Sequence, residues 1–324
     1  MARCRSGILV YATRWIGRPK PLGATLLRGV SRVTLEPGLP PTVSFEHEGK
    51  QNTVRPRLVI GADGRGSTVA RQIGAQIETE PVHHLIAGLL VDGVHAWPED
   101  EIAVGTDQST YNLVFPQGNG RLRLYACYPF DDRGRFSGVD AADNFLAAFR
   151  ASSMPYAEHV AGAEIAGPCQ GYPNADTWIH QPTAPGVVLI GDAAGHNDPT
   201  IGQGLSITMR DARMVAEALG ETTDWDTKLF VPYVSERRER MQRLRHVAHV
   251  MAILRCEFDD EAGHRRADLP NRAAQDPDVA ALLMVPFKGP FSVPDQAFGE
   301  RTIKSLLGEQ WSITGGGLLQ PTSP

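Results

Sequence analysis

The chain has 324 residues, of which 42% are hydrophobic and 21% are charged, and its formal net charge is −5. This length suits two domains or one large one with a substantial core, and the composition is that of an ordinary globular protein. The slightly negative charge gives no electrostatic reason to expect nucleic acid as a partner, and no apolar run approaches the roughly 18 residues of a membrane span.

The cysteines are isolated from one another and form no CxxC pair; they are Cys4, Cys127, Cys169 and Cys256. Such spacing favours a reducing, cytoplasmic setting in which all four act as small buried hydrophobes. Residues 1–22 match no pattern that we recognise.

Strand-like segments follow at 24–30, 32–35 and 43–48, with Pro/Gly-rich turns among them, and they lead to the apolar run 58–60. This pattern predicts a small antiparallel meander that feeds a buried parallel strand.

The run Gly61-Ala62-Asp63-Gly64-Arg65 follows that strand. Asp63 lies just past the strand, Gly64 removes a side chain, and the planar guanidinium of Arg65 suits a phosphate. Ser67 is placed to cap a following helix. The segment therefore indicates a cofactor-binding turn, or else a capped turn in which Asp63 bonds only backbone.

The middle of the chain alternates apolar and polar residues. Segments 111–115 and 121–127 flank the turn 117–120, which predicts an antiparallel hairpin, and 140–150 has the spacing of a helix.

A second Gly-rich turn follows the apolar run 186–190. It reads Gly191-Asp192-Ala193-Ala194, and a further cluster, Gly202-Gln203-Gly204, opens a predicted helix at 205–219. The Asp192 carboxylate can accept hydrogen bonds from ribose or ribityl hydroxyls, and the helix start favours negative charge on a flat ring. The alternative is a plain strand-to-helix turn whose Asp192 caps the helix.

The remaining pattern is helical. A long helix is predicted at about 225–258, and the alternating charges of its 236–240 run are expected to form a solvated face. Shorter helical patterns follow around 279–284 and 298–307, and the tail from Gly315 is expected to be frayed.

Two other chemistries gain no support. His246 and His249 lie three residues apart, but no third ligand has suitable spacing, so we expect structural roles and no metal site. Ser206 has no His/Asp partner at a readable spacing, which leaves hydrolase chemistry unsupported.

Together the two turns resemble the downstream FAD motifs of the aromatic-hydroxylase family of flavin monooxygenases, which is p-hydroxybenzoate hydroxylase-like. The Asp-Gly motif is 61–65, and the Gly-Asp motif is 191–194 with Pro199 and 202–204. Their order and the antiparallel region between them also match, over about residues 23–245. His196 stands one place later than the family's histidine, which puts its role in doubt.

The resemblance implies an α/β fold of the mixed α+β kind. It would have an incomplete Rossmann-like FAD-binding domain, an inserted antiparallel-sheet substrate domain and C-terminal helices. The expected parts are 1–22 as an unmatched lead, 23–80 and 181–245 as the FAD-binding domain, 81–180 as the substrate domain and 246–324 as a helical region.

It also implies the roles of individual residues. FAD would be bound by both turns and the helix start: Asp63, Gly64, Arg65, Gly191, Asp192, Ala193, Ala194, Pro199, Gly202, Gln203, Gly204 and Leu205. Pro199, beside the flavin, is the one catalytic candidate, because family members use NAD(P)H, oxygen and the cofactor rather than a protein nucleophile. Tyr111, Phe115 and Tyr125 would line a substrate pocket, with core packing as the alternative.

One departure is serious. No GxGxxG fingerprint precedes Gly61, although the family holds the ADP half of FAD there. We expect a truncated chain or misassigned reading frame rather than a rewired nucleotide site, and hence weak FAD binding and an exposed sheet edge.

The leading hypothesis is an FAD-dependent monooxygenase that hydroxylates a small organic, aromatic-type substrate with NAD(P)H and oxygen, as a monomer or homodimer. The alternatives are a flavin-dependent reductase or halogenase on the same scaffold, or an inactive fragment that acts as a binding module.

Overall fold

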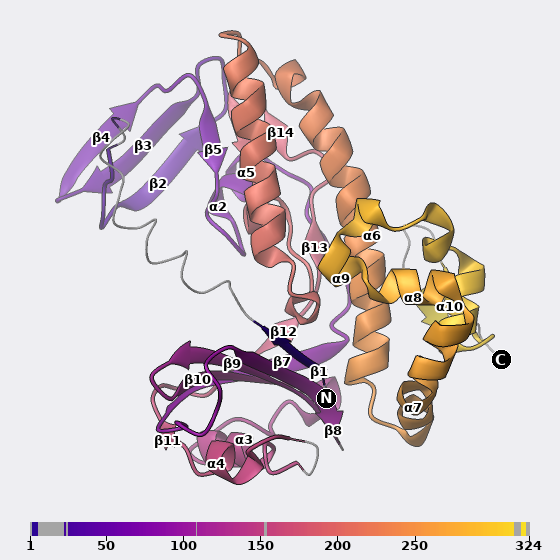
Figure 1. Ribbon diagram of the computed structural model, residues 1–324. Helices are drawn as coiled ribbons and strands as arrows, with labels where there is room; N and C mark the ends of the chain where they lie inside the picture. Colours follow the sequence, from indigo (N-terminus) through magenta and orange to yellow (C-terminus); the bar gives the residue numbers. More distant parts are fainter. Residues whose placement is uncertain are drawn as a thin grey trace. The chain divides into compact units, whose positions relative to one another are not determined.

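The computed structural model describes residues 2–5, 23, 25–107, 109–151, 154–313 and 319–321. The chain forms two compact units (Figure 1). Unit 1 consists of Met1–Ala24, Val82–Asn174 and Val250–Asn271, and unit 2 of Thr25–Pro81, Ala175–His249 and Arg272–Pro324. In the described parts of the chain, no helix is both long enough and apolar enough to cross a membrane.

Unit 1 is built on an antiparallel sheet of order β1-β8-β9-β10-β7-β11, with β12 also paired to β7. Its strands are β1 (Ala2–Arg5), β7 (His84–Asp92), β8 (Glu101–Asp107), β9 (Thr110–Gly118), β10 (Arg121–Pro129), β11 (Glu164–Ile165) and β12 (Gln170–Asn174). The predicted hairpin is confirmed as β9–β10, in which Cys127 pairs with Tyr111. The continuous apolar run of β7 is buried on both faces, as a central strand requires.

Short helices cover part of this sheet. They are α3 (Ala141–Ala147), α4 (Ala157–Ala161) and the 3₁₀ turn η1 (Phe130–Asp132). Phe136, Phe145 and Phe149 pack with the strands into one hydrophobic cluster. The predicted helix at 140–150 is confirmed in α3, although it ends earlier.

Among the described residues, unit 2 contains two three-stranded sheets and two two-stranded ones, which pair β6 with β13 and β16 with β17. The meander β2-β3-β4 is antiparallel, and the order β14-β15-β5 includes the parallel pair β5–β15. The strands of this unit are β2 (Ser31–Glu36), β3 (Thr42–His47), β4 (Lys50–Val54), β5 (Val59–Gly61), β6 (Glu78–Thr79), β13 (Thr177–Trp178), β14 (Thr183–Ala184), β15 (Val187–Leu189), β16 (Trp311–Ile313) and β17 (Leu319–Pro321).

The strand predicted at 24–30 is wrong for the described residues. Residues 25–30 form no strand, because their side chains are mostly exposed and no neighbouring strand pairs with them. The rest of the predicted meander is confirmed.

The parallel pair has an open side. β5 is the last strand of its sheet among the described residues, and Ile60 in its middle is 44% exposed. Parallel strands are normally buried within a sheet, so a β5 that ends its sheet and carries an exposed Ile60 agrees with the exposed sheet edge expected from the sequence.

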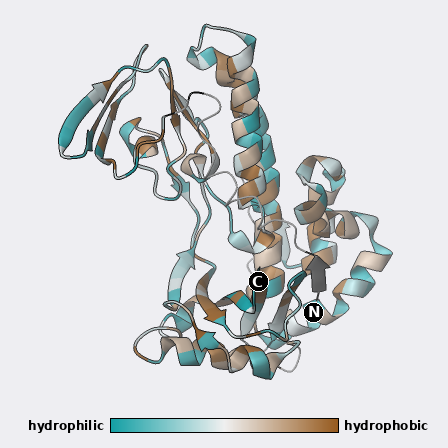
Figure 2. Cartoon of the chain, turned by 60° about the vertical axis from the view of Figure 1, so that its left-hand side comes forward, coloured by the Kyte–Doolittle hydropathy of each residue, from teal (hydrophilic) through white to brown (hydrophobic). Residues whose placement is uncertain are grey.

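The helices that follow the motifs include every predicted one and two that the sequence pattern did not predict, at 260–275 and 285–288. They are α2 (Thr68–Gln72), α5 (Gly204–Glu221), α6 (Val231–Cys256), α7 (Asp260–Gln275), α8 (Pro277–Leu283), α9 (Val285–Lys288) and α10 (Glu300–Leu307). The 3₁₀ turns are η2 (Gly191–Ala194), η3 (Pro199–Ile201), η4 (Thr227–Phe230), η5 (Pro290–Ser292) and η6 (Asp295–Phe298). Hydrophilic and hydrophobic residues alternate along the long helices (Figure 2). The tail from Gly315 is predicted to be frayed; residues 314–318 lie outside the described residues. Leu319–Pro321 pair with β16 as β17, so the prediction is wrong for these three residues.

Candidate functional site

The two Gly-rich turns lie side by side in unit 2. Parallel pairing of β5 with β15 brings the first turn (residues 61–66) and the second turn (residues 191–195) to the same end of the sheet. Nε of Arg65 lies 3.7 Å from Oδ2 of Asp192. The hypothesis that two turns 130 residues apart meet at one place is therefore confirmed.

Asp63 in the first turn is occupied by the helix that follows it. Its carboxylate accepts hydrogen bonds from the Ser67 hydroxyl at 2.5 Å and from the backbone N–H groups of Thr68 and Val69 at 2.7 and 3.1 Å. Ser67 caps α2 by accepting from the N–H of Ala70. Partial burial raises the pKa of Asp63, but the hydrogen bonds from Ser67, Val69 and Thr68 outweigh burial and hold it below its usual value. The geometry matches the capped-turn alternative, and a cofactor contact by Asp63 stays a prediction.

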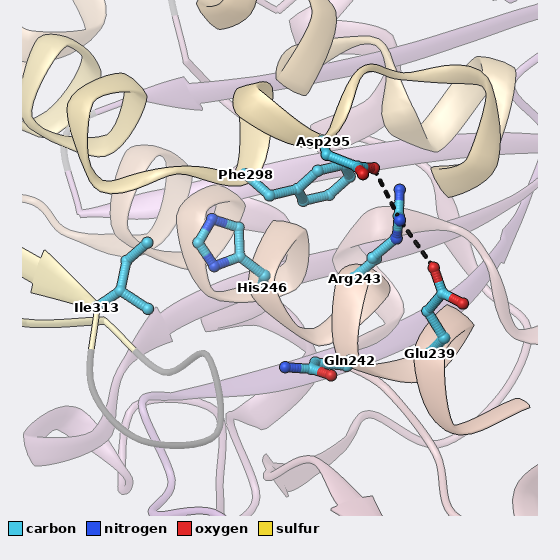
Figure 3. A pocket seen from close by; sticks show the side chains of 7 residues that line it. All are labelled: Glu239, Gln242, Arg243, His246, Asp295, Phe298 and Ile313. Atoms are coloured by element: carbon cyan, nitrogen blue, oxygen red, sulfur yellow. Dashed lines mark hydrogen bonds and ion pairs between the residues drawn. The ribbon is translucent and has the colours of Figure 1, made fainter. Parts of the chain in front are cut away.

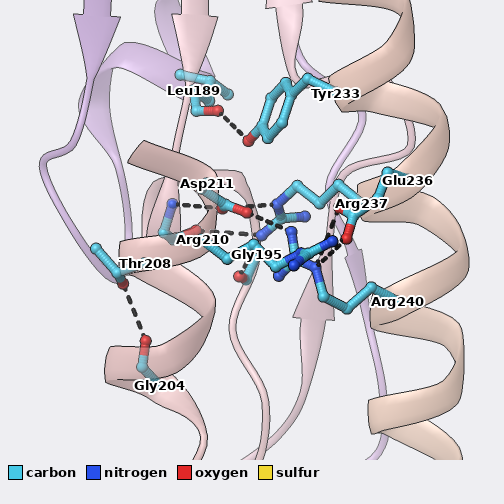
Figure 4. Close-up of polar contacts among 11 residues, drawn as sticks. Leu189, Gly195, Gly204, Thr208, Arg210, Asp211, Tyr233, Glu236, Arg237 and Arg240 are labelled. Atoms are coloured by element: carbon cyan, nitrogen blue, oxygen red, sulfur yellow. Dashed lines mark hydrogen bonds and ion pairs between the residues drawn. The ribbon is translucent and has the colours of Figure 1, made fainter. Parts of the chain in front are cut away.

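The backbone of the second turn is hydrogen-bonded to a buried ion pair, Asp211–Arg237 (Figure 4). Oδ2 of Asp211 accepts from the N–H of Gly191 and from Nε of Arg237, both at 2.9 Å. Nη2 of Arg237 donates to the carbonyls of Gly191 and Gly195 at 3.2 and 3.1 Å. One guanidinium and one carboxylate thus bond to both ends of the turn.

Arg240 extends this network. Its Nη2 donates to Oδ1 of Asp211 at 2.6 Å, and its Nε lies 3.1 and 3.2 Å from the two oxygens of Glu236. Glu236 also accepts from Nε of Arg210 at 2.6 Å. Burial lowers the pKa of Arg240, but Asp211 and Glu236 more than compensate and keep it above its usual value.

The prediction that the 236–240 run forms a solvated face is wrong for two of its members. Arg237 and Arg240 are only 2% and 3% exposed. The reason is helical phase, because Tyr233, Arg237, Arg240 and Leu244 recur at spacings of four, three and four, and all are buried. Sequence reasoning missed these arginines and Asp211, yet this spacing was the available signal.

Two glycines of the second turn are required by close packing. Gly191 has φ +58°, and a Cβ there would lie 2.8 Å from Oγ1 of Thr208. Gly195 has φ +108°, and its Cβ would lie 2.5 Å from Cα of Trp178. A Cβ at either position would force its neighbours to move, so the path of the turn is set by steric limits as well as by Arg237.

Other glycines leave open space instead. A Cβ on Gly64, Gly66, Gly202 or Gly204 would meet no atom within 4 Å. Exposed backbone at the end of two parallel strands is a cradle that a large ligand can approach closely. With the guanidinium of Arg65 and the carboxylate of Asp192 beside it, this donor set fits a phosphate and a polyhydroxyl chain, as FAD carries.

The other predicted cofactor residues belong to the same region. Ala193 and Ala194 are buried in η2, and Pro199 begins η3. Nε2 of Gln203 donates to the carbonyl of Pro286 at 2.6 Å, and Leu205 in the first turn of α5 is 54% exposed. The cofactor roles of these residues stay predictions.

His196 lies beside the two turns although its position is shifted. Its Nδ1 is 2.9 Å from the hydroxyl of Thr177. Burial and then the charge of Arg65 lower its pKa, so the ring is neutral at pH 7. The next residue, Asn197, is buried, and both of its amide atoms lack a hydrogen-bond partner among the described residues.

Three buried carboxylates lie close to this segment. They are Glu80, Asp176 and Asp198. Arg245 donates to Glu80 and its charge also acts on Asp176, while its guanidinium stacks on Trp178 at 3.1 Å from the ring centroid. Burial, and then the charges of Asp198 and Glu80, raise the pKa of Asp176 well above its usual value. Asp176 therefore keeps its proton more readily than an ordinary aspartate does.

The predicted substrate residues belong to unit 1. Tyr111, Phe115 and Tyr125 pack in a hydrophobic cluster with strand neighbours, and the hydroxyl of Tyr111 accepts from Nη1 of Arg255 at 3.1 Å. This packing fits the core alternative, and substrate contact by these rings stays a prediction.

Unit 1 also gathers His84, Cys127 and Cys256, whose potential ligand atoms lie within 4.8 Å of one another. Both ring nitrogens of His84 already face protein groups, since Nδ1 is 3.2 Å from His83 and Nε2 is 3.2 Å from Asn174. These contacts suit a packed polar group better than a metal ligand. In unit 2, His246 packs on Phe298, as a structural histidine would.

Comparison with known proteins gives a family. The family model described as FAD binding domain matches residues 33–248. A digeranylgeranylglycerophospholipid reductase of Methanosarcina acetivorans is 30% identical over 183 residues, which cover 53% of this chain and 42% of that protein. A 3-hydroxybenzoate 4-monooxygenase of Comamonas testosteroni is 25% identical over 261 residues, which cover 72% of this chain and 40% of that protein.

Among solved structures, HpxO of Klebsiella pneumoniae, complexed with FAD and uric acid, is similar with a TM-score of 0.62 at 19% identity. The likeness covers 82% of this chain and 66% of that one. The predicted mixed α/β fold is confirmed by this similarity. The aligned parts amount to less than half the length of the two curated relatives.

Proposed function

Because the chain belongs to the FAD binding domain family, we propose that its two adjoining turns bind FAD and that it hydroxylates a small organic, aromatic-type substrate with NAD(P)H and oxygen. The observation that carries the proposal is the approach of Arg65 to Asp192 across the parallel pair β5–β15, at 3.7 Å. It gives one site both a cation and a carboxylate beside open backbone.

Each part of the site has a proposed task. Arg65 binds a phosphate oxygen of FAD, Asp192 accepts hydrogen bonds from its hydroxyls, and residues 202–205 lie against the ring. The N–H groups at the start of α5, a helix of 18 residues, stabilise negative charge on the ring in the manner of an oxyanion hole. Bound FAD supplies the redox chemistry, taking electrons from NAD(P)H and passing them to oxygen.

The protein's own residues orient and shield. Arg237 and Asp211 fix the second turn, so Asp192 is presented without rearrangement on binding. Neutral His196 adds no second positive charge next to Arg65. Pro199, the first residue of η3, keeps the backbone rigid on the side proposed for the flavin ring.

A flavin-dependent reductase is the second candidate. It is favoured by the 30% identity to the reductase of Methanosarcina acetivorans. Oxygen distinguishes the two, because a hydroxylase consumes oxygen with NAD(P)H and substrate, whereas a reductase oxidises NAD(P)H equally well without oxygen.

FAD binding is the first test. Titration of the purified full chain should quench FAD fluorescence, and Arg65→Gln and Asp192→Asn should each weaken binding about 10- to 100-fold, the effect of losing a charge-assisted hydrogen bond. Arg55→Gln, an exposed arginine on the same unit, is the matched control and should bind FAD like the parent.

A colourless protein that stays colourless with excess FAD would contradict the proposal and leave the binding-module alternative. If FAD binds, oxygen uptake with NAD(P)H and a panel of phenols and aromatic acids tests the hydroxylase. We place the reaction in the cytoplasm and propose a homodimer as the assembly; sedimentation analysis of the FAD-loaded chain tests the latter.

A further inference from the structure

A cavity lies in unit 2 beside α5, the helix that follows the second turn. It measures about 220 Å³ and lies among α5, α6 and the segment after α9. Among its lining residues are Ser206, Arg210, Arg240, Leu244, Lys288 and Phe291. Three cationic side chains and no carboxylate line it, so its lining is positively charged.

Arg240 is the central feature. Its side chain is 4% exposed, and its Nε and Nη2 are bonded to Glu236 and Asp211. The remaining nitrogen, Nη1, is buried and has no hydrogen-bond partner among the described residues. A buried charged donor without an acceptor is costly, so an acceptor supplied by a ligand would stabilise this arrangement.

The charges around Arg240 do not balance. Two carboxylates, Asp211 and Glu236, are shared by three guanidinium groups, those of Arg210, Arg237 and Arg240. Lys288 adds a further positive charge at the cavity and forms no ion pair in the described part of the chain. The local excess of positive charge favours an anion.

A neighbouring cavity shows the contrast (Figure 3). It measures about 290 Å³ and is lined by Arg243 and His246, together with Glu239, Asp295 and apolar residues. There Arg243 lies between two carboxylates, with Nη2 2.8 Å from Glu239 and 2.9 Å from Asp295. Its charge is compensated by the protein, unlike the charge at the Arg240 cavity.

We propose that the Arg240 cavity binds an oxyanion group, a phosphate or a carboxylate, of a small molecule. Arg210 and Lys288 hold the anion with charge-assisted hydrogen bonds, Ser206 adds a hydroxyl, and Arg240 contributes further positive charge to the lining. A cavity of about 220 Å³ has room for several waters, each about 30 Å³, or for one such group. Ile207, Leu244 and Phe291 provide apolar wall for a short carbon body.

The experiment is calorimetric titration of the full chain with inorganic phosphate, in excess FAD and at constant ionic strength set with chloride. We expect saturable binding of one phosphate, weakened about tenfold by Arg210→Gln and about tenfold by Lys288→Gln. Arg213→Gln is the matched control, since it is one helical turn from Arg210 on α5, exposed and outside the cavity lining. Arg240 is left intact because its removal would also unfold the network.

The variants separate this site from the proposed cofactor site. Phosphate binding weakened by Arg65→Gln but not by Lys288→Gln would place the anion with the cofactor and overturn the inference, as would equal losses in Arg210→Gln and Arg213→Gln. If FAD does not bind, the phosphate titration still tests the cavity alone. Phenyl phosphate identifies the source: tighter binding than phosphate supports an organic ligand packed on Phe291, and equal binding supports a free inorganic anion.

Discussion

The two turns carry the same kind of sequence, a strand followed by glycine and aspartate, but they are supported differently. In the first turn Asp63 is bonded by its own helix start, within six residues of the chain. In the second turn Asp192 makes no such bond, and the backbone is held by Asp211 and Arg237 from two later helices. The first turn is therefore a local structure, and the second depends on the tertiary fold.

The largest effect is expected from breaking the support of the second turn. Arg237→Met removes one of the two guanidinium groups paired with buried Asp211, together with the donor to the carbonyls of Gly191 and Gly195, and should destabilise the chain by about 3–5 kcal/mol. Urea unfolding followed by circular dichroism measures this. Arg238→Met, exposed on the same helix, should change stability by less than about 0.5 kcal/mol. A loss below about 1 kcal/mol for Arg237→Met would show that the second turn is as independent as the first.

Steric limits on the second turn give the next effect. Gly195→Ala puts a methyl group 2.5 Å from the backbone of Trp178 at φ +108° and should cost about 1–3 kcal/mol. Gly220→Ala, inside α5 with no atom within 4 Å of the new methyl, should instead stabilise by about 0.5–1 kcal/mol. Thermal unfolding of both variants checks the opposite signs. A neutral Gly195→Ala would mean that the turn can move.

The hydrogen bonds of Asp63 in the first turn should make the stability of the chain depend on pH. The pKa of Asp63 is lowered from 3.8, so its ionised form stabilises the fold at neutral pH and this stabilisation is lost as pH falls through the folded pKa. Asp63→Asn should cost about 1 kcal/mol at pH 7, a typical capping effect, and almost nothing near pH 2. Urea midpoints across pH 2–8 measure this.

Asp176 is the opposite case and serves as the control. Its raised pKa means that the fold loses stability as pH rises above 3.8 toward the folded value. The side chain in Asp176→Asn stays neutral, so the stability of this variant relative to the parent should increase as pH rises. Parallel pH profiles for the two variants would contradict both assignments.

The smallest effect on stability is expected between the turns. Arg65 and Asp192 are each more than a third exposed and 3.7 Å apart, so Arg65→Gln should change stability by less than about 0.5 kcal/mol. Under the proposed function, the substitution should act on FAD affinity instead. A large loss of stability without a change in FAD binding would make this pair structural.

The sequence predicted local features well, because hydrophobic spacing, glycines and caps act within a few residues. The β9–β10 hairpin, the helices α5 and α6, and the Ser67 cap all follow from such patterns. The meeting of the two turns was inferred from resemblance and depends on the pairing of β5 with β15. Arg237 and Arg240 were misjudged because a run of alternating charge resembles a solvated face unless its helical phase is compared with Tyr233 and Leu244.

Gln203 connects the start of α5, on the side proposed for the flavin, to the C-terminal part of the chain. Gln203 lies just before the first residue of α5, and its amide donates to the carbonyl of Pro286, 83 residues later in the chain. A protein truncated before α9 would lack the Pro286 carbonyl, and the N-terminal end of α5 would lose this hydrogen bond. Helix α9 thus supports the start of α5, next to the proposed cofactor site, and shortened versions made for crystallisation should keep it.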